Sequence, residues 1–527
     1  MTYRVLVADE ILPEGLGVLR DAPDVSVDDV RLDRPALLNR LADYHALIVR
    51  SGTPVDRALI ERGPRLRVIG RAGLALGNVD IGAATEHGVM VLNTPEAYSV
   101  AAAEHTLALL LALCRHLPQA DAAVRRGEWD RGRYLGVQLA GKTLGLLGLG
   151  RVGQLVAARA QGFGVNVVAF DPFADDEEAR RLGVTLAPLD EVLAQADFLS
   201  MHADLTPETR QLLGEAELAR LKPGARIVNC AQGGLIDEAA LHAALVSGQV
   251  AGAALDVFDQ EPPAGSPLLN LPNVVVSPHL GASTREAQAE VSVQIARQVL
   301  RALRGEDFAN VVNLPFVVGP DFAQSRPYLQ LAERIGALQR QLADGPIEAV
   351  EVEVRGAEVA GRVKAVAVAL LKGLLDGSLA EPVNYINAPL LAARQGLRVG
   401  QGRGLPAGDY ANQISCRVRW PGGARLIAGT LFGGADGRIV LLDEFRMDAR
   451  PVGEALVMFS RDVPGVIGAV GTLLQQYGVN IAEWRLGRDQ PGGTALSFIN
   501  LDSSVPAEGM RALLALPQVV AVKRVAL

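Results

Sequence analysis

A glycine-rich turn between an apolar run and a predicted helix constrains the fold of this chain more than any other feature. The turn reads GLGRVG over residues 148–153, follows the apolar run TLGLLG, and opens a helix that we expect to end near Phe163. The three glycines permit, in order, a tight turn, a close approach of the backbone to a bound group, and close packing of helix on strand. The pattern predicts an α/β domain whose parallel sheet is covered by helices on both faces.

An acidic residue closes the next predicted strand and indicates the kind of ligand. Asp171 lies 18 residues after Gly153, where a carboxylate accepts hydrogen bonds from the ribose hydroxyls and repels a 2′-phosphate. The helix N-terminus adds free N–H groups for a pyrophosphate. A packing turn without a ligand is the alternative, but the strand, the helix and the acid together favour NAD. The expected NAD-binding residues of this segment are Gly148, Gly150, Arg151, Val152, Gly153 and Asp171.

Strands alternate with helices on both sides of this turn, which predicts two α/β units. A long apolar helix is expected from about Ser99 to Leu117. The expected strands are 4–8, 46–50, 67–70 and 89–93 before that helix, and TLGLLG, 165–171, 197–202, 226–230, 251–257 and 274–277 after it. We expect a flavodoxin-like substrate-binding domain from residues 1–98 and 283–314, and a Rossmann-type domain of residues 99–282 inserted into it. A helix predicted for about 284–304 returns to the first unit. This return would leave a cleft between the two domains.

The remainder of the chain reads as two further modules. The segment LPFVVGPDF has the Pro/Gly character of a linker, and residues 315–450 mix helices with strands as an α+β intervening domain. The run GGADG at 433–437 predicts a turn between two strands. Residues 454–527 read strand, helix, strand, strand, helix, strand, which is the order of a ferredoxin-like module.

Composition excludes several classes of protein. The 527 residues are 49% hydrophobic and 21% charged, which is typical of globular domains. The net charge of −8 argues against a nucleic-acid-binding protein. Three cysteines, Cys114, Cys230 and Cys416, have neither metal-ligand spacing nor the density of a disulfide framework. With no signal peptide and with its most apolar run too short to span a bilayer, the chain is expected to be a cytoplasmic protein without a membrane partner.

Three later segments carry residues that are suited to acid–base chemistry. They read VNCAQGG at 228–234, DVFDQEPP at 256–263 and SPHLGAST at 277–284. Histidine suits proton transfer because its ordinary pKa lies near the working pH of most enzymes, although a lone histidine is more often structural. Together the segments resemble motifs of the D-isomer-specific 2-hydroxyacid dehydrogenases, which carry Arg, Glu and His there at the same intervals of 29 and 18 residues.

The resemblance implies a role for one residue of each segment. His279 would be the catalytic acid/base, and Glu261 would bond its other ring nitrogen and fix its tautomer. Gln232 stands where the family carries the substrate-binding arginine. The resemblance also places three residues along the cofactor, namely Cys230, Gly281 and, at the nicotinamide end, Asp256.

The chain departs from the family pattern at several positions of the expected cleft. Gln232 is neutral, whereas an arginine would clamp a carboxylate with two charge-assisted hydrogen bonds. Ala75 and Gly77 replace a glycine and an aspartate, Tyr98 replaces an asparagine, and Asp204 replaces a proline. The departures indicate either a changed substrate or relaxed constraint, unless each is compensated locally.

Three arginines match positions that bind an anionic substrate in phosphoglycerate dehydrogenases. These are Arg50 in RSGT, Arg71 in GRAG next to Gly73, and Arg131 in WDRGRYLG, which the family supplies across a dimer. A phosphate needs such charges, although an isolated arginine is often only a solvated surface residue. The resemblance therefore implies a phosphorylated 2-hydroxy acid as the small-molecule substrate.

The C-terminal module resembles an ACT domain. The motifs are SRDVPGVIG at 460–468 and YGVNIA at 477–482. ACT modules pair side by side and bind amino acids at the shared edge, where Asp462 and Asn480 match effector-binding positions. An acid suits an ammonium group and an amide suits a carboxylate, so the resemblance implies an amino-acid effector such as serine. The alternative is that Asp462 caps a turn and Asn480 lies in a loop.

Module by module, the whole chain resembles the long-form D-3-phosphoglycerate dehydrogenases. The resemblance implies NAD-dependent oxidation of D-3-phosphoglycerate to 3-phosphohydroxypyruvate, the first step of serine biosynthesis, in a homodimer or homotetramer. Two alternatives remain open from the residues alone. One is a dehydrogenase for another 2-hydroxy or 2-keto acid, and the other is a catalytically degenerate regulator that binds NAD and an amino acid.

Overall fold

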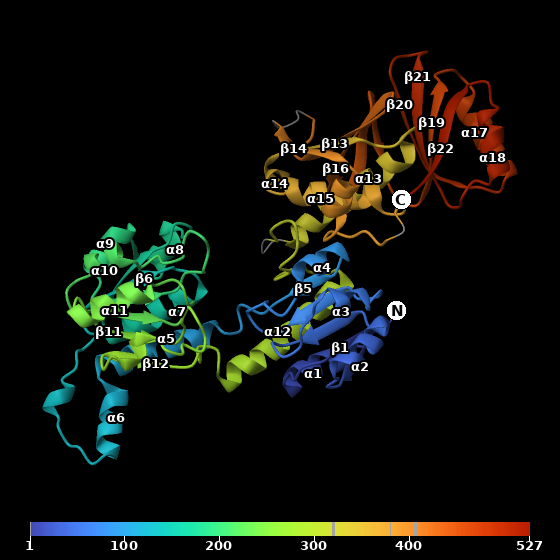
Figure 1. Ribbon diagram of the computed structural model, residues 1–527. Helices are drawn as coiled ribbons and strands as arrows, with labels where there is room; N and C mark the ends of the chain where they lie inside the picture. The colour runs from blue at the N-terminus through green and yellow to red at the C-terminus, as the bar shows by residue number, and fades with distance from the viewer. Residues whose placement is uncertain (1, 319–321, 380, 405–408) are drawn as a thin grey trace.

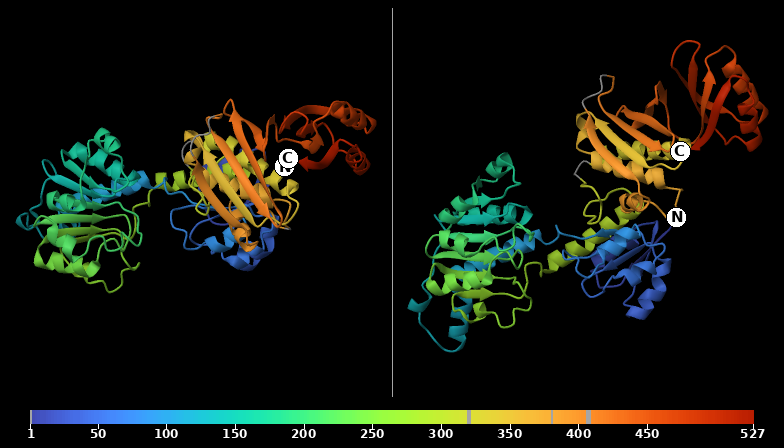
Figure 2. Two further views of the ribbon diagram at one scale, coloured as in Figure 1. Left: turned by 90° about the horizontal axis from the view of Figure 1, so that it is seen from above. Right: turned by 45° about the horizontal axis from the view of Figure 1, so that its top comes forward.

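The computed structural model describes residues 2–318, 322–379, 381–404 and 409–527. Figure 1 shows four bodies along the chain, and Figure 2 shows the same separation from two further directions. The second body, which holds the glycine-rich turn, is joined to the first by helix α12 (Arg285–Arg304) and by the segment before α5 (Ser99–Cys114). The expected α/β and α+β fold classes are confirmed.

The first body is an α/β unit built on a five-stranded parallel sheet of order β2-β1-β3-β4-β5 within the described residues. Strand β3 is buried along its whole length, as expected of a parallel strand covered on both faces. Helices α1 and α12 cover one face, and α2, α3 and α4 cover the other. The elements not yet bounded are β1 (Tyr3–Val7), β2 (Val25–Asp29), β3 (Ala46–Val49), β4 (Val68–Arg71), β5 (Met90–Leu92), α1 (Pro13–Arg20), α2 (Arg34–Arg40), α3 (Arg57–Glu61) and α4 (Ile81–Glu86).

Helix α12 returns to the first body as expected and packs against α1. A side chain at Gly15 would lie 2.3 Å from the carbonyl oxygen of Ser292, so glycine permits the close crossing of the two helices. The hydroxyl of Ser292 also accepts a hydrogen bond from the N–H of Leu12 at 3.0 Å. The chain therefore leaves the first body before α5 and re-enters it along α12.

The second body is a seven-stranded parallel sheet, again counted over the described residues, with the order β12-β11-β10-β9-β6-β7-β8. Helices α5 and α7 cover one face, and α9, α10 and α11 cover the other. The elements are β6 (Thr143–Leu147), α7 (Arg151–Ala160), β7 (Asn166–Phe170), α8 (Asp176–Arg181), β8 (Thr185–Leu186), α9 (Leu189–Gln195), β9 (Phe198–Met201), α10 (Glu215–Arg220), β10 (Ala225–Asn229), α11 (Glu238–Ser247), β11 (Val250–Leu255) and β12 (Val274–Val276).

The long helix expected from Ser99 to Leu117 is in fact broken. Helix α5 ends at Cys114, and α6 (Leu117–Arg125) leaves at an angle of 62° after His116, whose φ is +54°. Figure 1 shows α6 as an arm that projects from the second body. In the part of the chain that the structure describes, no single helix is long and apolar enough to cross a membrane, although this bent pair would pass on length and composition together.

The third body is α+β, with a mixed sheet of order β14-β13-β15-β16-β17-β18. Helices α13 and α15 pack on one face, and glycines at their crossing bring the two backbones together, since a side chain at Gly373 would lie 1.9 Å from the carbonyl oxygen of Glu333. The expected turn at 433–437 joins β16 to β17. The elements are α13 (Phe322–Leu342), β13 (Ala349–Arg355), α14 (Ala357–Ala360), α15 (Val363–Leu375), α16 (Ala388–Arg394), β14 (Arg398–Gly404), β15 (Gln413–Trp420), β16 (Gly423–Phe432), β17 (Asp436–Leu442) and β18 (Phe445–Ala449).

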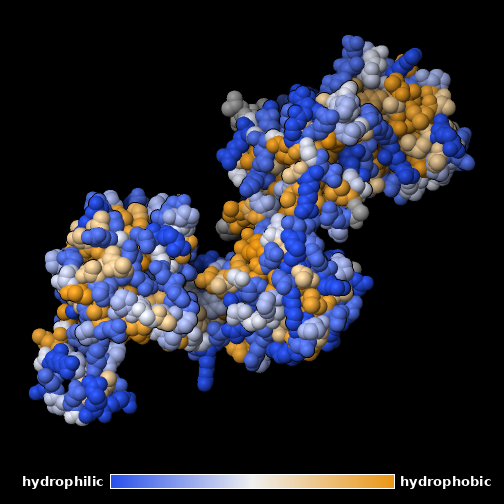
Figure 3. Space-filling view, viewed as in Figure 1, coloured by the Kyte–Doolittle hydropathy of each residue, from blue (hydrophilic) through white to orange (hydrophobic). Residues whose placement is uncertain are grey.

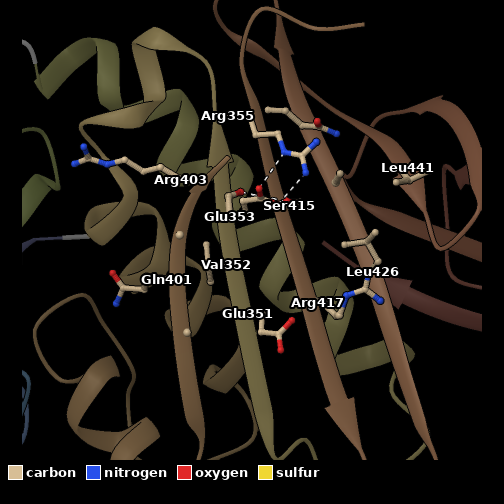
Figure 4. A pocket seen from close by; sticks show the side chains of 14 residues that line it. Glu351, Val352, Glu353, Arg355, Gln401, Arg403, Ser415, Arg417, Leu426 and Leu441 are labelled. Carbon is tan, nitrogen blue, oxygen red and sulfur yellow. Dashed lines mark hydrogen bonds and ion pairs between the residues drawn. The ribbon is translucent and has the colours of Figure 1, made fainter. Parts of the chain in front are cut away.

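The other face of this sheet carries a cavity of about 450 Å³ (Figure 4). Strand β14 has glycines at 400 and 402 on this face, which leaves its floor hollow. The guanidinium of Arg355 donates to both carboxylate oxygens of Glu353, at 3.2 and 3.1 Å, so these two charges neutralise one another. The charged part of the lining consists of three arginines and two glutamates, a mixed set that does not by itself indicate a ligand.

The fourth body has the predicted βαββαβ order, with antiparallel strands arranged β20-β21-β19-β22. Helices α17 and α18 cover one face. The other face contributes to the same apolar core as the third body, through Val457, Leu496 and Phe498 among others. The elements are β19 (Glu454–Arg461), α17 (Val466–Gln476), β20 (Ile481–Arg488), β21 (Thr494–Leu501), α18 (Ala507–Leu514) and β22 (Val519–Ala526).

Candidate active site

The glycine-rich turn lies between β6 and α7, where the strand order of the second sheet reverses. Gly148 has φ +101°, and a side chain there would lie 2.6 Å from the backbone of His202. A side chain at Gly153 would lie 2.4 Å from the carbonyl oxygen of Gly148, so this glycine lets the helix approach the strand. A side chain at Gly150 would meet only open space. The space in front of Gly150 and the free N–H groups of the α7 N-terminus fit a pyrophosphate.

Asp171 stands at the end of β7 and faces the same turn. Its carboxylate accepts hydrogen bonds from the N–H of Leu149 at 2.8 Å and of Phe173 at 2.9 Å. These bonds fix the carboxylate beside the turn while leaving acceptor capacity for ribose hydroxyls. Arg151 begins α7 and forms an ion pair with Glu96, which precedes α5. The residues of this segment thus fit a dinucleotide with an unphosphorylated ribose.

His202 forms one wall of the turn and is a neutral group. Burial lowers its pKa to about 4, and its Nε2 is 2.9 Å from the hydroxyl of Ser200. Cys230 lies at the end of β10, and burial raises the pKa of its thiol to about 12. Both groups are therefore uncharged at neutral pH and add no charge beside the expected cofactor.

His279 and Glu261 lie together, as the spacing of their motifs implied. The Nδ1 of His279 is 2.8 Å from the Oε2 of Glu261. The other carboxylate oxygen of Glu261 accepts from the N–H of Phe258 at 3.2 Å. The side chain of His279 is 58% exposed, so the imidazole remains accessible to a ligand. Such a pair can move a proton at Nε2 while the carboxylate holds Nδ1.

The loop that carries Gln232 is held against the loop that carries Glu261. A side chain at Gly233 would lie 1.9 Å from the carbonyl oxygen of Phe258, so glycine permits this contact. The backbone carbonyl of Gln232 accepts from the side-chain amide of Asn229 at 2.9 Å. The structure therefore brings the segments of Gln232, Glu261 and His279 to one edge of the second sheet.

Asp256 is buried beneath the His279 loop and accepts hydrogen bonds from several donors. Its Oδ1 accepts from the Ser277 hydroxyl at 2.5 Å and from the N–H of Leu280 at 2.8 Å, and lies 3.2 Å from the Nε2 of His105. Its Oδ2 accepts from the N–H of Gly281 at 2.8 Å. Burial opposes the ionisation of Asp256, but these donors together lower its pKa below the ordinary value.

These contacts give Asp256 a structural role in the His279 loop. Its backbone carbonyl also accepts the N–H of His279 at 2.9 Å, and His279 has the uncommon φ of +55°. The carboxylate thus fixes the backbone on the C-terminal side of the imidazole and helps to hold a conformation that costs free energy. The side chain of Asp256 has no exposed surface in this conformation, so its contact with the nicotinamide stays a prediction.

Two members of this network, His105 and Ser277, were not predicted from the sequence. His105 lies in the middle of α5, and Ser277 follows β12; the ring of His105 is within 3.1 Å of the Ser277 hydroxyl. A polar residue inside an otherwise apolar helix, AEHTLALLLAL, was the available signal. Its partner at Asp256 is 151 residues away in the chain, so no local pattern could identify it.

Arg50, Arg71 and Gly73 form a second group, at the carboxyl ends of β3 and β4 in the first body. The guanidinium of Arg71 folds over Gly73, close to the point where a side chain would stand. Arg50 bonds the side chain of Gln288 on α12. Burial lowers the pKa of Arg71, and the charge of Arg50 acts in the same direction. The group is therefore a concentration of positive charge, which suits an anion.

Three of the departures and Arg131 lie on the surface. Ala75, Gly77 and Asp204 are exposed, and a side chain at Gly77 would meet nothing within 4 Å. Arg131 is exposed on the arm beyond α6. No hydrogen bond or ion pair among the described residues links Arg131 to the other predicted site residues. Its proposed action across a dimer therefore stays a prediction.

In the fourth body, Asp462 and Asn480 already have partners within the chain. Asp462 accepts from the N–H of Gly492 at 3.0 Å and from the guanidinium of Arg488 at 3.3 Å. Asn480 donates to Asp502 at 2.6 Å. Effector binding at these residues stays a prediction. Within the described ranges, no group of three or more His, Cys, Asp or Glu side chains could hold a metal ion.

Comparison with known proteins defines the class of this chain. Residues 107–281 match the NAD-binding domain of the D-isomer specific 2-hydroxyacid dehydrogenases, 324–443 match the D-3-phosphoglycerate dehydrogenase intervening domain, and 455–518 match the ACT domain. A solved structure, the TT0316 protein from Thermus thermophilus, aligns over 59% of this chain and 99% of its own length, with 37% identity and a TM-score of 0.52. The chain is an NAD-binding D-isomer specific 2-hydroxyacid dehydrogenase.

Full-length relatives narrow this class further. D-3-phosphoglycerate dehydrogenase of Methanocaldococcus jannaschii is 40% identical over 98% of this chain and 98% of its own length. The enzyme of the same name from Bacillus subtilis is 38% identical over 99% of both chains. That from Mycobacterium tuberculosis is 41% identical over 97% of both. The chain therefore belongs to the D-3-phosphoglycerate dehydrogenase family.

Proposed function

We propose that this chain oxidises D-3-phosphoglycerate to 3-phosphohydroxypyruvate with NAD, the step that opens serine biosynthesis. The observation that carries the proposal is the His279–Glu261 pair, held at 2.8 Å on the same sheet edge as the GLGRVG turn. Similarity to enzymes named for this substrate over nearly the whole chain supports it. Bound NAD supplies the acceptor for the hydride that leaves C2 of the substrate.

The protein residues would handle the proton and hold the reacting groups. His279 takes the proton of the C2 hydroxyl at Nε2, while Glu261 accepts a hydrogen bond from Nδ1 and stabilises the imidazolium that results. Asp256 holds the loop of His279 from below. Gly150 and the N-terminus of α7 would bind the pyrophosphate, and Asp171 would accept from the adenosine ribose.

The substrate anions would be bound from both bodies. Arg50 and Arg71 supply the charge for the phosphate, and Arg131 of a second copy would add to it. Gln232 would take the place of the arginine that clamps the carboxylate in the family. An amide donates only through its NH₂ group and brings no charge, so we expect Gln232 to bind the carboxylate more weakly than an arginine would.

We also propose an assembly and an effector. Figure 3 shows a gathering of apolar surface on the fourth body. The exposed apolar side chains of that body include Val463, Ile467, Leu486, Leu514 and Val520. Surfaces of this kind are buried when subunits associate. Paired ACT domains and contacts through the arm, where Trp129 and Leu135 are 80% and 85% exposed, support a homodimer or homotetramer that binds serine near Asp462 and Asn480.

We also propose the domain boundaries and the cellular location of the enzyme. We place the substrate-binding domain at 1–98 and 283–314, the NAD-binding domain at 99–282, the intervening domain at 315–450 and the ACT domain at 454–527. We also propose the cytoplasm as the location of the enzyme, because its proposed substrate is a phosphorylated metabolite and its three cysteines are free among the described residues.

The test of the proposed function compares the protein with its Gln232→Arg variant in NAD-coupled oxidation of D-3-phosphoglycerate. Restoring one preorganised donor is expected to raise kcat/KM by about a hundredfold. Gln195→Arg, which adds the same charge to the exposed end of α9, is the matched control and should change nothing.

Other outcomes of this test separate the alternatives. Equal activity of the protein and its Gln232→Arg variant would mean that another group has taken over the role of the arginine. Absence of turnover in both, with NAD still bound, would contradict the proposed reaction and favour an NAD-binding regulator. A marked preference for an unphosphorylated 2-hydroxy acid would change the substrate but not the reaction class.

A further inference from the structure

Arg71 carries a positive charge that no carboxylate of the described residues pairs with directly, although Asp9 lies close enough to act on its pKa. Among the described residues it forms no ion pair, and its Nε is buried without a hydrogen-bond partner. Its one hydrogen bond is a long one, 3.4 Å from Nη1 to the carbonyl oxygen of Ala72. A half-buried guanidinium whose Nε has no partner is costly, and an anion that accepted its hydrogen bonds would reduce the cost. A bound ligand therefore explains the position of the Arg71 side chain better than a contribution to fold stability does.

A second unsatisfied group stands beside Arg71. Thr94 is fully buried, and its hydroxyl makes no hydrogen bond of good geometry within the described ranges, although it lies close enough to the Tyr98 hydroxyl to lower the pKa of that phenol. Its backbone N–H donates to the carbonyl oxygen of Gly73 at 3.1 Å, which places it against the same backbone that Arg71 covers. Buried hydroxyls are nearly always hydrogen-bonded in folded proteins. The unsatisfied Nε of Arg71 and the poorly bonded hydroxyl of Thr94, both next to Gly73, indicate a ligand site.

Tyr98 completes this group. A side chain at Gly73 would lie 3.0 Å from the Tyr98 hydroxyl and 2.9 Å from the central carbon of the Arg71 guanidinium, so the two groups converge on one point. Burial raises the pKa of Tyr98, while the charges of Arg71 and Arg50 and the hydroxyl of Thr94 act in the opposite direction. The phenol stays protonated at neutral pH and can donate a hydrogen bond.

The position of Tyr98 in the chain indicates that its hydroxyl, beside Arg71, serves substrate binding. Tyr98 is the residue that precedes α5, at the point where the chain passes from the first body to the NAD-binding body. It stands where the family pattern has an asparagine, and it therefore brings to the Arg71 side of the first body a donor that the family pattern does not predict. Gln232, on the NAD-binding side, has lost a donor and a charge.

We propose that Tyr98 is a specificity-determining residue whose hydroxyl, with the Arg71 guanidinium and the Thr94 hydroxyl, binds an oxyanion of the substrate. This inference rests on the proposed function and identifies the residues of the substrate-binding body that hold the ligand. The oxyanion belongs either to the C3 phosphate or to the C1 carboxylate. In both cases Tyr98 offsets part of the binding that Gln232 cannot provide.

The test uses Tyr98→Phe, which keeps the ring and removes only the hydroxyl. Loss of one hydrogen bond to a charged group is expected to raise KM for D-3-phosphoglycerate by about ten- to a hundredfold, with a smaller change in kcat. D-Glycerate, which has the carboxylate but no phosphate, distinguishes the two sources. An effect on D-3-phosphoglycerate alone identifies the phosphate, and an equal effect on both substrates identifies the carboxylate.

Tyr3→Phe is the matched control, because Tyr3 begins β1 at the opposite end of the same sheet. It should leave both KM values unchanged. A Tyr98→Phe protein with unchanged KM for both substrates would overturn the inference. A kcat that falls while KM stays constant would also overturn it, since binding of the ground state would then not involve the hydroxyl.

A binding measurement separates this inference from the proposed reaction. Titration of the full chain with inorganic phosphate and with acetate, followed by calorimetry, reports the subsite without turnover. Weaker binding of either anion to Tyr98→Phe supports the subsite even if D-3-phosphoglycerate is not oxidised. Equal binding by both proteins, or none by either, rejects the subsite whatever the reaction proves to be.

Discussion

Replacing Asp256 by Asn tests whether the buried carboxylate positions the His279 loop. If the amide oxygen keeps the three contacts of Oδ1, the amide NH₂ replaces Oδ2 and meets the N–H of Gly281. Two donors then face each other in a buried place, and the negative charge that strengthened the other bonds is gone. Leaving one buried donor unsatisfied costs about 1–3 kcal/mol, and hydrogen bonds lose strength without the charge.

We therefore expect the competent loop to lose about 2–3 kcal/mol relative to other conformations, which lowers kcat by about 30- to 160-fold. The assay is the steady-state oxidation of D-3-phosphoglycerate at saturating NAD. NAD affinity, measured by fluorescence titration, should change less than kcat, because the GLGRVG turn is untouched. A kcat within threefold of the original would refute the positioning role of Asp256.

The pH dependence gives this prediction a second readout. Because the folded pKa of Asp256 is depressed, its stabilising contribution is fully present above the pKa of an unfolded aspartate, about 3.9. It is lost as the pH falls below that value and through the lower folded pKa. The difference in unfolding free energy between the protein and Asp256→Asn should be constant from neutral pH to about pH 4 and shrink at lower pH. A difference that stays constant down to pH 2 would contradict the argument.

Two further predictions concern the acid–base pair and the effector. Glu261→Gln should lower kcat by about a hundredfold or more while NAD affinity stays constant, because an amide no longer stabilises the His279 imidazolium. Steady-state kinetics measure this change. An unchanged kcat would show that Glu261 has no part in the mechanism. Asp462→Ala should weaken L-serine binding at least about tenfold in calorimetry, as a carboxylate that holds an ammonium is lost. Failure of the unaltered protein to bind serine would instead leave Asp462 as the turn residue that its bond to Gly492 indicates.

Local patterns predicted most of the fold. Most strands of both α/β units were expected from apolar runs, and central strands such as β3 and β9 are buried along their whole length. Strands β2 and β8 were not expected, because β2 reads VSVDD at a sheet edge and β8 has only two residues. The long helix expected to reach Leu117 ends at Cys114. His116 adopts a left-handed conformation there, and no glycine in the sequence indicated this break.

Local patterns likewise predicted one part of the candidate site and not the other. Its motifs are contiguous in sequence, so the turn at 148–153 and the segments of Glu261 and His279 could be identified from residue types and spacing. The hydrogen bonds from His105 and Ser277 to Asp256 could not be identified from the sequence. His105 is 151 positions away from Asp256, and Ser277 is 21 positions away. The same holds for the convergence of Tyr98, Arg71 and Thr94.

The sequence by itself determined the class of fold and the chemistry that this chain carries. Glycines at positions that need a left-handed turn or a close contact, an acid at the end of a strand, and a histidine and a glutamate in long motifs are local requirements, and local requirements are written in the sequence. Tertiary structure alone decided which buried groups find partners. Asp256 is satisfied by donors from two segments, α5 and the loop of His279, whereas Arg71 keeps an Nε without a partner, and that difference depends on distances which only the folded chain sets.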